Sequence, residues 1–440
     1  MKKTIGKIIA CTLSALLICG GGVLVACDGN TEGEAGEIDS SGNTVVKIMF
    51  HVDSKSAEGI AYKRRVDAFN KAYAEKKIKA SAKFQARTAG AAGYETELIN
   101  NKVEGTLADI ITFDAPNCAA YAGNILYDIT ELVPQNVQDD FISLNEYGDK
   151  LYGLPIQESS AGFFYNKKIF RDAGVDVSSY TVSNPWTFDQ FKDTCARIKN
   201  YCEVAAVDMR IDAVKDETAP YLLYPLIYAA GGNFTSPDGL TATGYFDSDK
   251  TYNGFNFIKE LKDAGYTSNA IGATDFFTGK VGMYLSSGWT IPDIKNKYKD
   301  TFKSTDDWGL LPYPKSEVAA SATGSWCFGI TDNHHPDKSA AIELLLWMTN
   351  VDSATDITNA TGMIPARKSV QTNYEPGSPE DVLLSQLKTT GKARPATVVY
   401  PQFSTSFNQI IGGITRGDDL RQLLSTATQS LQSEMNKHKK

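Results

Sequence analysis

The chain has 440 residues, of which 42% are hydrophobic and 22% are charged, and this length favours two or three globular domains of about 150 residues each. Its 44 basic and 52 acidic residues give a formal net charge of −8, which argues against a nucleic acid held on a basic surface. With 4 histidines and 7 cysteines, the chain has little material for a histidine-built metal site or a disulfide scaffold.

Residues 1–26 have the features of a secretory signal. Lys2, Lys3 and Lys7 precede an apolar stretch, and small residues lead into Cys27. The apolar stretch is shorter than the roughly 20 residues of a spanning helix and ends in glycines, so a weak transmembrane anchor is the less favoured alternative. The tetrad Leu-Val-Ala-Cys resembles a bacterial lipobox, which implies that Cys27 is lipidated and becomes the first residue of the mature chain.

Residues 27–44 are rich in glycine, serine and acidic side chains and are almost without apolar ones. This composition predicts a flexible tether between a lipid and a folded body. Removal of residues 1–26 deletes three lysines and no acidic residue, so the mature chain is still more acidic. A lipid on an acidic body predicts attachment to the outer face of the cell membrane rather than insertion into it.

The body then begins with alternating strand and helix patterns. An apolar run over 45–51 predicts a buried strand, and aromatic and aliphatic residues at helical spacing predict a helix through 62–73. Strict alternation over 78–86 and a short apolar run over 108–113 predict two more strands. This order is typical of a parallel sheet with helices on its faces.

The same order returns after Gly153. A strand is predicted over 161–165, a capping box from Thr187 to Gln190 predicts the start of a helix, and another strand is predicted over 281–285. Further helices are predicted over 252–261, 337–350 and 420–435. Two α/β lobes are therefore expected, and such folds bind ligands at strand ends or between domains.

Motifs of the common enzyme classes are missing from the sequence, which contains no H-E-x-x-H, G-x-S-x-G or G-x-x-x-x-G-K-[ST]. His334 and His335 are adjacent and predict an exposed turn rather than a metal site. Cys195 and Cys202 leave open a local disulfide or two unpaired thiols. Two carboxylates for glycoside hydrolysis can come from anywhere in a sequence, so that class of enzyme stays an alternative.

A series of short motifs nevertheless occurs in a distinctive order. The motifs are Tyr152-Gly-Leu-Pro155, Phe164-Tyr-Asn-Lys167, Phe170-Arg-Asp-Ala-Gly174, Pro185-Trp-Thr-Phe188, Pro225-Leu-Ile-Tyr-Ala-Ala-Gly-Gly232, Phe276-Phe-Thr-Gly-Lys-Val-Gly-Met283, Gly288-Trp289, Gly362-Met-Ile-Pro-Ala-Arg367 and Tyr400-Pro-Gln-Phe403. Each motif alone is weak, and their joint order is specific. The series resembles the family 1 extracellular solute-binding proteins of ABC importers, of the maltose/oligosaccharide-binding type, from about Val45 to the end of the chain.

The resemblance implies a two-lobed, periplasmic-binding-protein-like α/β fold in which each lobe is a mostly parallel sheet flanked by helices. It implies that residues 45–154 with 325–370 form lobe 1, and that residues 156–322 with 371–440 form lobe 2. The lobes would be joined by a multi-strand hinge and close on solute like a clamp. The expected crossings lie near Pro155, at Thr323–Gly324 and past Arg367.

The resemblance also implies a site, because much of this family binds mono- or oligosaccharides. A sugar site needs aromatic faces together with carboxylates and amides. Each candidate also has a structural alternative, which is core packing for an aromatic ring and a surface or hinge role for a polar side chain. Trp289 is the first choice, since it follows Gly288 and a glycine lets backbone and ligand approach closely. The candidates are Asp53, Phe113, Asp114, Gln157, Glu158, Tyr221, Tyr224, Trp289, Trp326 and Phe407.

Together these features predict a monomeric, lipid-anchored receptor outside the cytoplasm. It would bind a carbohydrate, with an oligosaccharide favoured, and deliver it to the membrane subunits of an ABC permease without turnover, metal or cofactor. One alternative is the same scaffold with another solute such as a glycerol phosphate ester, for which Arg87 and Arg367 are the candidate phosphate ligands. The other alternative is a secreted glycan-degrading enzyme.

Overall fold

The computed structural model describes residues 37–87, 93–335, 337–370 and 373–439, which belong to one compact unit, Glu34–Lys440. The predicted signal over 1–26, the predicted lipidation site Cys27 and most of the predicted tether lie outside the described residues. Among the helices that are described, none combines the length and the apolar character needed to cross a membrane.

The strands form a mixed sheet. They are β1 (Thr44–Phe50), β2 (Ile78–Phe84), β3 (Ile110–Asp114), β4 (Asn145–Tyr147), β5 (Lys150–Asn166), β6 (Ala205–Asp208), β7 (Val281–Ser287), β8 (Trp308–Leu311), β9 (Ser321–Ile330), β10 (Ile364–Pro365) and β11 (Gly391–Lys392). The main path runs β2-β1-β3-β9-β5-β7-β6, and the four other strands attach to β5 or β9.

Among the strands of the main path, parallel pairing occurs only at its two ends, and off the path β11 pairs with β9 in parallel. β2, β1 and β3 are parallel neighbours, and so are β6 and β7. The pairs β3–β9, β9–β5 and β5–β7 are antiparallel. The sequence predicts mostly parallel sheets because its alternation of strands and helices is visible only at these ends. The strands β5 and β9, which lie between the two ends, are antiparallel to each other.

The helices cover the faces of the sheet and include those predicted from the sequence. Thr187 makes the predicted capping box at the start of α6. The helices are α1 (Ala57–Ala72), α2 (Tyr94–Glu104), α3 (Cys118–Tyr121), α4 (Gln135–Gln138), α5 (Lys167–Asp172), α6 (Phe188–Ile198), α7 (Thr218–Ala229), α8 (Asp249–Asp263), α9 (Thr290–Asn296), α10 (Ser339–Met348), α11 (Val351–Thr361), α12 (Pro379–Thr389), α13 (Tyr400–Arg416) and α14 (Leu420–Asn436), with short 3-10 turns η1 (Ala115–Asn117), η2 (Lys199–Tyr201) and η3 (Lys368–Val370).

Four clusters of buried hydrophobic residues occur in this unit, and we group them in pairs into two sets. The first, which we call lobe 1, packs around β1 and β3 with α1 and α10 and includes Val46, Ile110 and Leu344. The second, lobe 2, packs around β6 and β7 with α7, α8, α13 and α14 and includes Val207 and Phe403. Each set excludes water from its own apolar surface, so each lobe has a core of its own.

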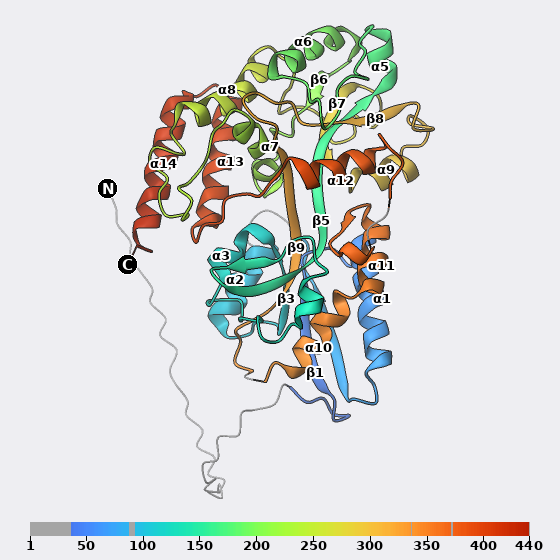
Figure 1. The fold of residues 1–440 in the computed structure, drawn as a ribbon, viewed down its shortest axis with the longest axis vertical. Coiled ribbons are helices and arrows are strands. Elements are labelled where there is room, and N and C mark those ends of the chain that lie inside the picture. Colours follow the sequence, from blue (N-terminus) through green and yellow to red (C-terminus); the bar gives the residue numbers. More distant parts are fainter. Residues whose placement is uncertain (1–36, 88–92, 336, 371–372, 440) are drawn as a thin grey trace, which may run out of the picture. The chain divides into compact units, whose positions relative to one another are not determined.

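The strands β5 and β9 pass from one core to the other, and they lie side by side in the middle of Figure 1. On β5, Leu154 and Ile156 belong to the core of lobe 1, and Phe163 belongs to that of lobe 2. On β9, Ala322 packs in lobe 2 and Phe328 in lobe 1. These changes of core support the expected crossings near Pro155 and Thr323–Gly324, while the lobe boundaries themselves stay predictions.

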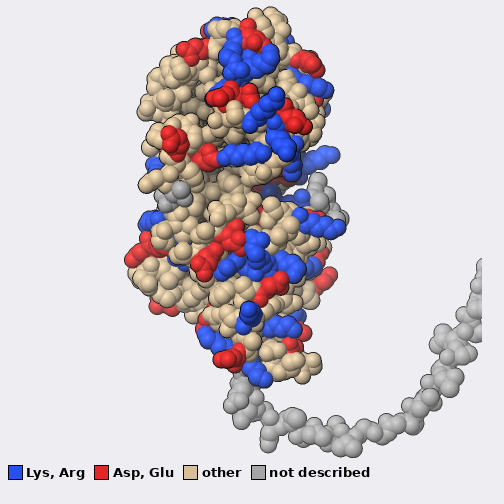
Figure 2. Space-filling model, turned by 90° about the vertical axis from the view of Figure 1, so that its right-hand side faces the viewer, with Lys and Arg blue, Asp and Glu red and all other residues tan. Residues whose placement is uncertain are grey.

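Charges of both signs are intermingled over the face in Figure 2, which carries no broad basic patch. A surface of this kind does not concentrate the positive charge that holds a nucleic-acid backbone.

Candidate functional site

A cavity of about 630 Å³ lies where the two lobes meet. Lobe 1 contributes the segment after β1, the first turn of α1, the end of β3 and the last turn of α11. Lobe 2 contributes the first turns of α7 and α9 and the coil before α13. The middle parts of β5 and β9 also line it, so the cavity lies at the crossing strands.

One wall of the cavity is aromatic. Trp289 caps the start of α9 and is 41% exposed, although it is a large apolar side chain. Tyr221 on α7 stands beside it, with the ring centroids 5.9 Å apart and the planes tilted by 44°. The hydroxyl of Tyr221 makes a 2.7 Å hydrogen bond with Ser159 Oγ, and burial raises the pKa of this phenol to about 12. The wall therefore combines a hydrogen-bonded phenol with a partly exposed indole.

The structure gives Gly288 a packing role. A side chain at Gly288 would meet the carbonyl oxygen of Gly362 at 2.6 Å, so this glycine allows the start of α9 to approach the end of α11. The close contact is made between two segments of the chain, and the glycine is explained without a ligand.

A second aromatic group, formed by His51 and Trp326, lines the cavity at β9. The imidazole of His51 stacks on Trp326 with a centroid distance of 3.5 Å and an interplanar angle of 2°. The guanidinium carbon of Arg87 lies 4.9 Å from the centroid of the same indole. Burial, together with the charge of Arg87, lowers the pKa of His51 well below its ordinary value, so this ring is neutral. One face of Trp326 is consequently covered by protein.

Arg394 is the most heavily bonded side chain at the cavity. Its Nη1 and Nη2 donate to the two carboxylate oxygens of Asp114 at 2.8 and 2.6 Å. Nη1 also donates to Glu217 at 2.8 Å, and the hydroxyl of Tyr400 donates to the same Glu217 oxygen at 2.6 Å. The two parallel hydrogen bonds between Arg394 and Asp114 are the strong, directional form of an ion pair.

A polar chain runs from α1 to the end of α11. Tyr62 donates to Glu58 Oε1 at 2.5 Å, Gln157 Nε2 donates to the same oxygen at 3.5 Å, and Thr361 donates to Gln157 Oε1 at 2.8 Å. Burial raises the pKa of Glu58 to about 7, against the opposing hydrogen bond from Tyr62. Glu58 is thus a cavity carboxyl that changes charge near neutral pH.

The structure brings several of the predicted site residues together and leaves others elsewhere. Asp53, Asp114, Gln157, Tyr221, Trp289 and Trp326 line the cavity. Phe113, Glu158, Tyr224 and Phe407 are buried and are absent from that lining.

These four buried residues have structural partners instead. Phe407 packs in the core of lobe 2 and Phe113 in that of lobe 1. Tyr224 accepts a hydrogen bond from the backbone of Thr323, and Glu158 accepts one from Ser143. Their contacts fit the structural alternatives, so we leave them out of the proposed site.

Sequence reasoning missed His51, Glu58, Glu217 and Arg394. His51 and Glu58 flank the predicted Asp53, so their place after the first strand was an available signal. Arg394 lies in a coil before α13 and is joined to Asp114 only by the fold. No local pattern marks such a residue.

Arg367 does not reach the cavity. It is buried in lobe 1, where it pairs with Asp140 at 2.9 Å and donates to the carbonyl of Thr349 at 2.5 Å. The expectation that Arg367 could hold a phosphate in the cleft is therefore wrong.

Metal and thiol chemistry have little support in the described residues. In that part of the chain no group of three or more His, Cys, Asp or Glu side chains is placed to hold a metal ion. His334 is exposed as expected, while His335 pairs with Asp109 at 2.7 Å. Cys195 and Cys202 are free thiols, which decides between the two alternatives left open.

The comparisons with known proteins agree with this architecture. A family model described as "bacterial extracellular solute-binding protein" matches residues 64–384. A binding protein of Brucella abortus (strain 2308) is 26% identical over 246 residues, which are 52% of this chain and 54% of that protein. This chain therefore matches about half the length of that relative.

Solved structures show the same fold over nearly the whole chain. The cyclic alpha-maltosyl-1,6-maltose binding protein from Arthrobacter globiformis aligns with a TM-score of 0.71 and 21% identity, covering 90% of this chain and 100% of that one. UgpB from Mycobacterium tuberculosis, in complex with glycerophosphocholine, aligns with a TM-score of 0.71 and 19% identity over the same shares. The predicted family resemblance and two-lobed α/β fold are confirmed.

Proposed function

The chain belongs to the bacterial extracellular solute-binding proteins, and from this premise we propose that it is a receptor that binds a carbohydrate between its lobes. An oligosaccharide is the favoured solute, because a cavity of about 630 Å³ has the size of a site that encloses a small organic ligand. Binding is noncovalent and is followed by delivery to the membrane subunits of an ABC permease.

The observation that carries this proposal is the exposed indole of Trp289 beside a network of carboxylates and amides. A sugar ring has an apolar face that stacks on an indole and hydroxyls that bond to Asp, Glu, Gln and Tyr side chains. The cavity presents both kinds of group, with Trp289 from lobe 2, Asp53 and Glu58 from lobe 1, and Gln157 from the crossing strand β5.

A glycerol phosphate ester is the second candidate, since Arg87, Lys297 and Arg394 all line the cavity and UgpB was solved with glycerophosphocholine. Each of these cations already has an acidic partner. Arg87 pairs with Glu95 at 3.1 Å, Lys297 with Asp293 at 2.7 Å, and Arg394 with Asp114. An anion would compete with these carboxylates, so the pairing favours a neutral sugar.

A thermal-shift panel tests the solute class directly. A ligand that binds only the folded state must raise the melting temperature. We expect maltooligosaccharides or related sugars to raise it and glycerophosphodiesters to leave it unchanged. A rise in melting temperature with the phosphate esters alone would show that the solute is a glycerol phosphate ester and not a sugar. Release of products from labelled oligosaccharides would instead support the glycan-degrading enzyme.

Membrane tethering is a separate part of the proposal, and it rests on the lipobox sequence at Cys27, outside the described residues. Cys27→Ala should block acylation and either release the protein from membranes or leave an unprocessed precursor. Fractionation of cells that express each form provides the measurement. Processed Cys27→Ala protein that still sediments with membranes would contradict the anchor.

A further inference from the structure

The ion pair between Arg394 and Asp114 connects the two lobes. Asp114 ends β3, and the preceding Phe113 is part of the core of lobe 1. Arg394 precedes α13, whose Tyr400 and Phe403 pack in the core of lobe 2. The bond therefore joins side chains that are anchored in different cores.

The pair is buried and closely defined in geometry. The side chains of Arg394 and Asp114 are 3% and 6% exposed, and two parallel N–H···O bonds join them. Glu217 and Tyr400, which belong to lobe 2, also accept hydrogen bonds from Nη1 of this guanidinium. Arg394 is thus held by its own lobe and aimed at the other one.

The pair also lies beside the crossing strand β9. Asp114 is the register partner of Trp326, and a side chain at Gly324 would lie 3.1 Å from Arg394 Nη2. A rotation of one lobe about this crossing would tilt the carboxylate away from the plane of the guanidinium. Two parallel hydrogen bonds tolerate only a narrow range of such angles.

We propose that Arg394 and Asp114 form an interlobe latch that sets the angle between the lobes before solute arrives. Opening the lobes breaks the two short hydrogen bonds between Arg394 and Asp114, which are charged and parallel and therefore strong, and this loss disfavours the opened arrangement. Glu217 belongs to the same lobe as Arg394, so a movement of the lobes separates Arg394 from Asp114 and not from Glu217. The latch rests on the two-lobed fold and not on the identity of the solute.

Distances between the lobes test this proposal without any ligand. Spin labels on p-acetylphenylalanine at exposed positions 75 and 189, one in each lobe, avoid the native cysteines. Pulsed electron paramagnetic resonance should show one narrow distance distribution for the unsubstituted full chain. Asp114→Asn and Arg394→Gln should each add a second population, with the open-to-closed ratio changed by roughly tenfold.

A double variant tests whether Arg394 and Asp114 act through their mutual contact or whether each substitution independently loosens the structure. The double variant Asp114→Asn/Arg394→Gln should match the single variants, because both remove the same contact. Arg394→Lys keeps the charge without the two parallel N–H groups, so it should still broaden the distribution. A wild-type distribution in Arg394→Lys would show that charge alone sets the angle and would overturn the geometric latch.

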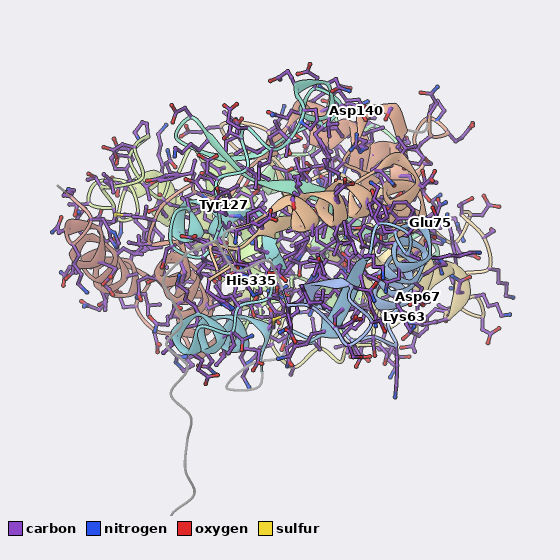
Figure 3. All side chains as sticks on the ribbon, turned by 90° about the horizontal axis from the view of Figure 1, so that it is seen from below. Lys63, Asp67, Glu75, Tyr127, Asp140 and His335 are labelled. Atoms are coloured by element: carbon purple, nitrogen blue, oxygen red, sulfur yellow. The ribbon has the colours of Figure 1, made fainter. Side chains whose placement is uncertain are left out.

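Two matched controls remove a carboxylate from an ion pair within lobe 1, and both positions are labelled in Figure 3. Asp140→Asn disturbs the pair with the buried Arg367, and Asp67→Asn disturbs the exposed pair with Lys63. Neither should change the interlobe distance. Unchanged distances in folded Asp114→Asn would overturn the latch, even if Arg394→Gln does not fold. Because no solute is added, failure in the sugar panel would count only against the carbohydrate proposal.

Discussion

The tryptophans at the cavity differ in which of their faces are free. His51 stacks on Trp326 in parallel, whereas the ring of Tyr221 beside Trp289 is tilted, and Trp289 is 41% exposed. Stacking of a sugar needs an uncovered ring face, so exposure and not residue type separates the two. Trp289 is therefore the residue on which affinity should depend most.

Trp289→Ala should weaken sugar binding by roughly 10- to 100-fold, because burial of such a face contributes about 1.5–3 kcal/mol. The unliganded melting temperature should stay near that of the wild type, since the side chain is 41% exposed. Calorimetric titration beside a thermal melt measures both effects. Trp308→Ala is the control, and this core residue should lose about 3–5 kcal/mol of stability instead. Unchanged affinity in Trp289→Ala would remove the residue from the site.

Burial raises the pKa of Glu158 to about 7 from an ordinary value of 4.5, although Ser143 donates a hydrogen bond to it. The native state then binds more protons than the unfolded chain between these pH values, so the free energy of unfolding falls as pH rises through this window. Glu158→Gln should remove up to about 3 kcal/mol of that decline. Urea unfolding at pH 5 and pH 7.5 measures it, and an identical decline in wild type and variant would contradict the shift.

Part of the site could be predicted from residue order alone. Asp53 and Asp114 follow strands, and the carboxyl ends of parallel strands meet at one edge of a sheet. Arg394 could not be predicted in this way, because 280 positions separate it from Asp114 and only the complete fold unites them. Phe407 was misplaced for a related reason, since an aromatic residue in a family motif looks the same in a core and in a cleft.

At the scale of elements, the long strand β5 shows why sequence patterns fell short. Only 161–165 was predicted as strand, yet β5 extends over Lys150–Asn166. Nearly every residue of β5 is buried, so the alternation of buried and exposed positions that marks a surface strand is missing. Pro155 and Gly153 further hid the strand, because these residues usually interrupt pairing.

Helix α13 was missed for a different reason. Gly412 and Gly413 interrupt its interior, and glycine is unfavourable in helices. A side chain at Gly413 would meet Leu423 of α14 at 2.4 Å, so the glycine allows the two helices to pack closely. Tertiary packing here outweighs local propensity.

Phe407 on this helix gives a test at the same scale. Phe407→Ala should cost about 3–5 kcal/mol of stability, because the ring is fully buried in lobe 2. Sugar affinity should be unchanged at temperatures where the variant is folded. Chemical unfolding and calorimetric titration provide the two measurements. Weaker binding by a folded variant with normal stability would return Phe407 to the site.

At the scale of the whole molecule, the proposed receptor function predicts that binding and closure are coupled through the interlobe angle. A solute that contacts both lobes shifts the population toward the closed arrangement. If the proposed latch holds part of that arrangement in place, a variant without it should have farther to close.

Small-angle scattering should accordingly show a smaller radius of gyration for the wild type at saturating sugar. The decrease should be larger for Asp114→Asn, because its unliganded ensemble is more open. Asp140→Asn should behave like the wild type. An equal decrease in the radius of gyration for Asp114→Asn and the wild type would show that closure does not depend on the latch.

The pairing of β3 with β9 has a consequence for how the chain reaches its native state. Ile110 pairs with Ile330, so the sheet of lobe 1 cannot be completed until all of lobe 2 up to β9 has been synthesised. Contacts of such long range are slow to form, because an extended loop must close before they contribute any stability. A nascent chain that ends before residue 321 therefore exposes one unpaired edge of β3 and should bind chaperones and be sensitive to proteases. We expect this delay to keep lobe 1 incompletely folded during synthesis, and an incompletely folded chain is what passage through a narrow export channel requires.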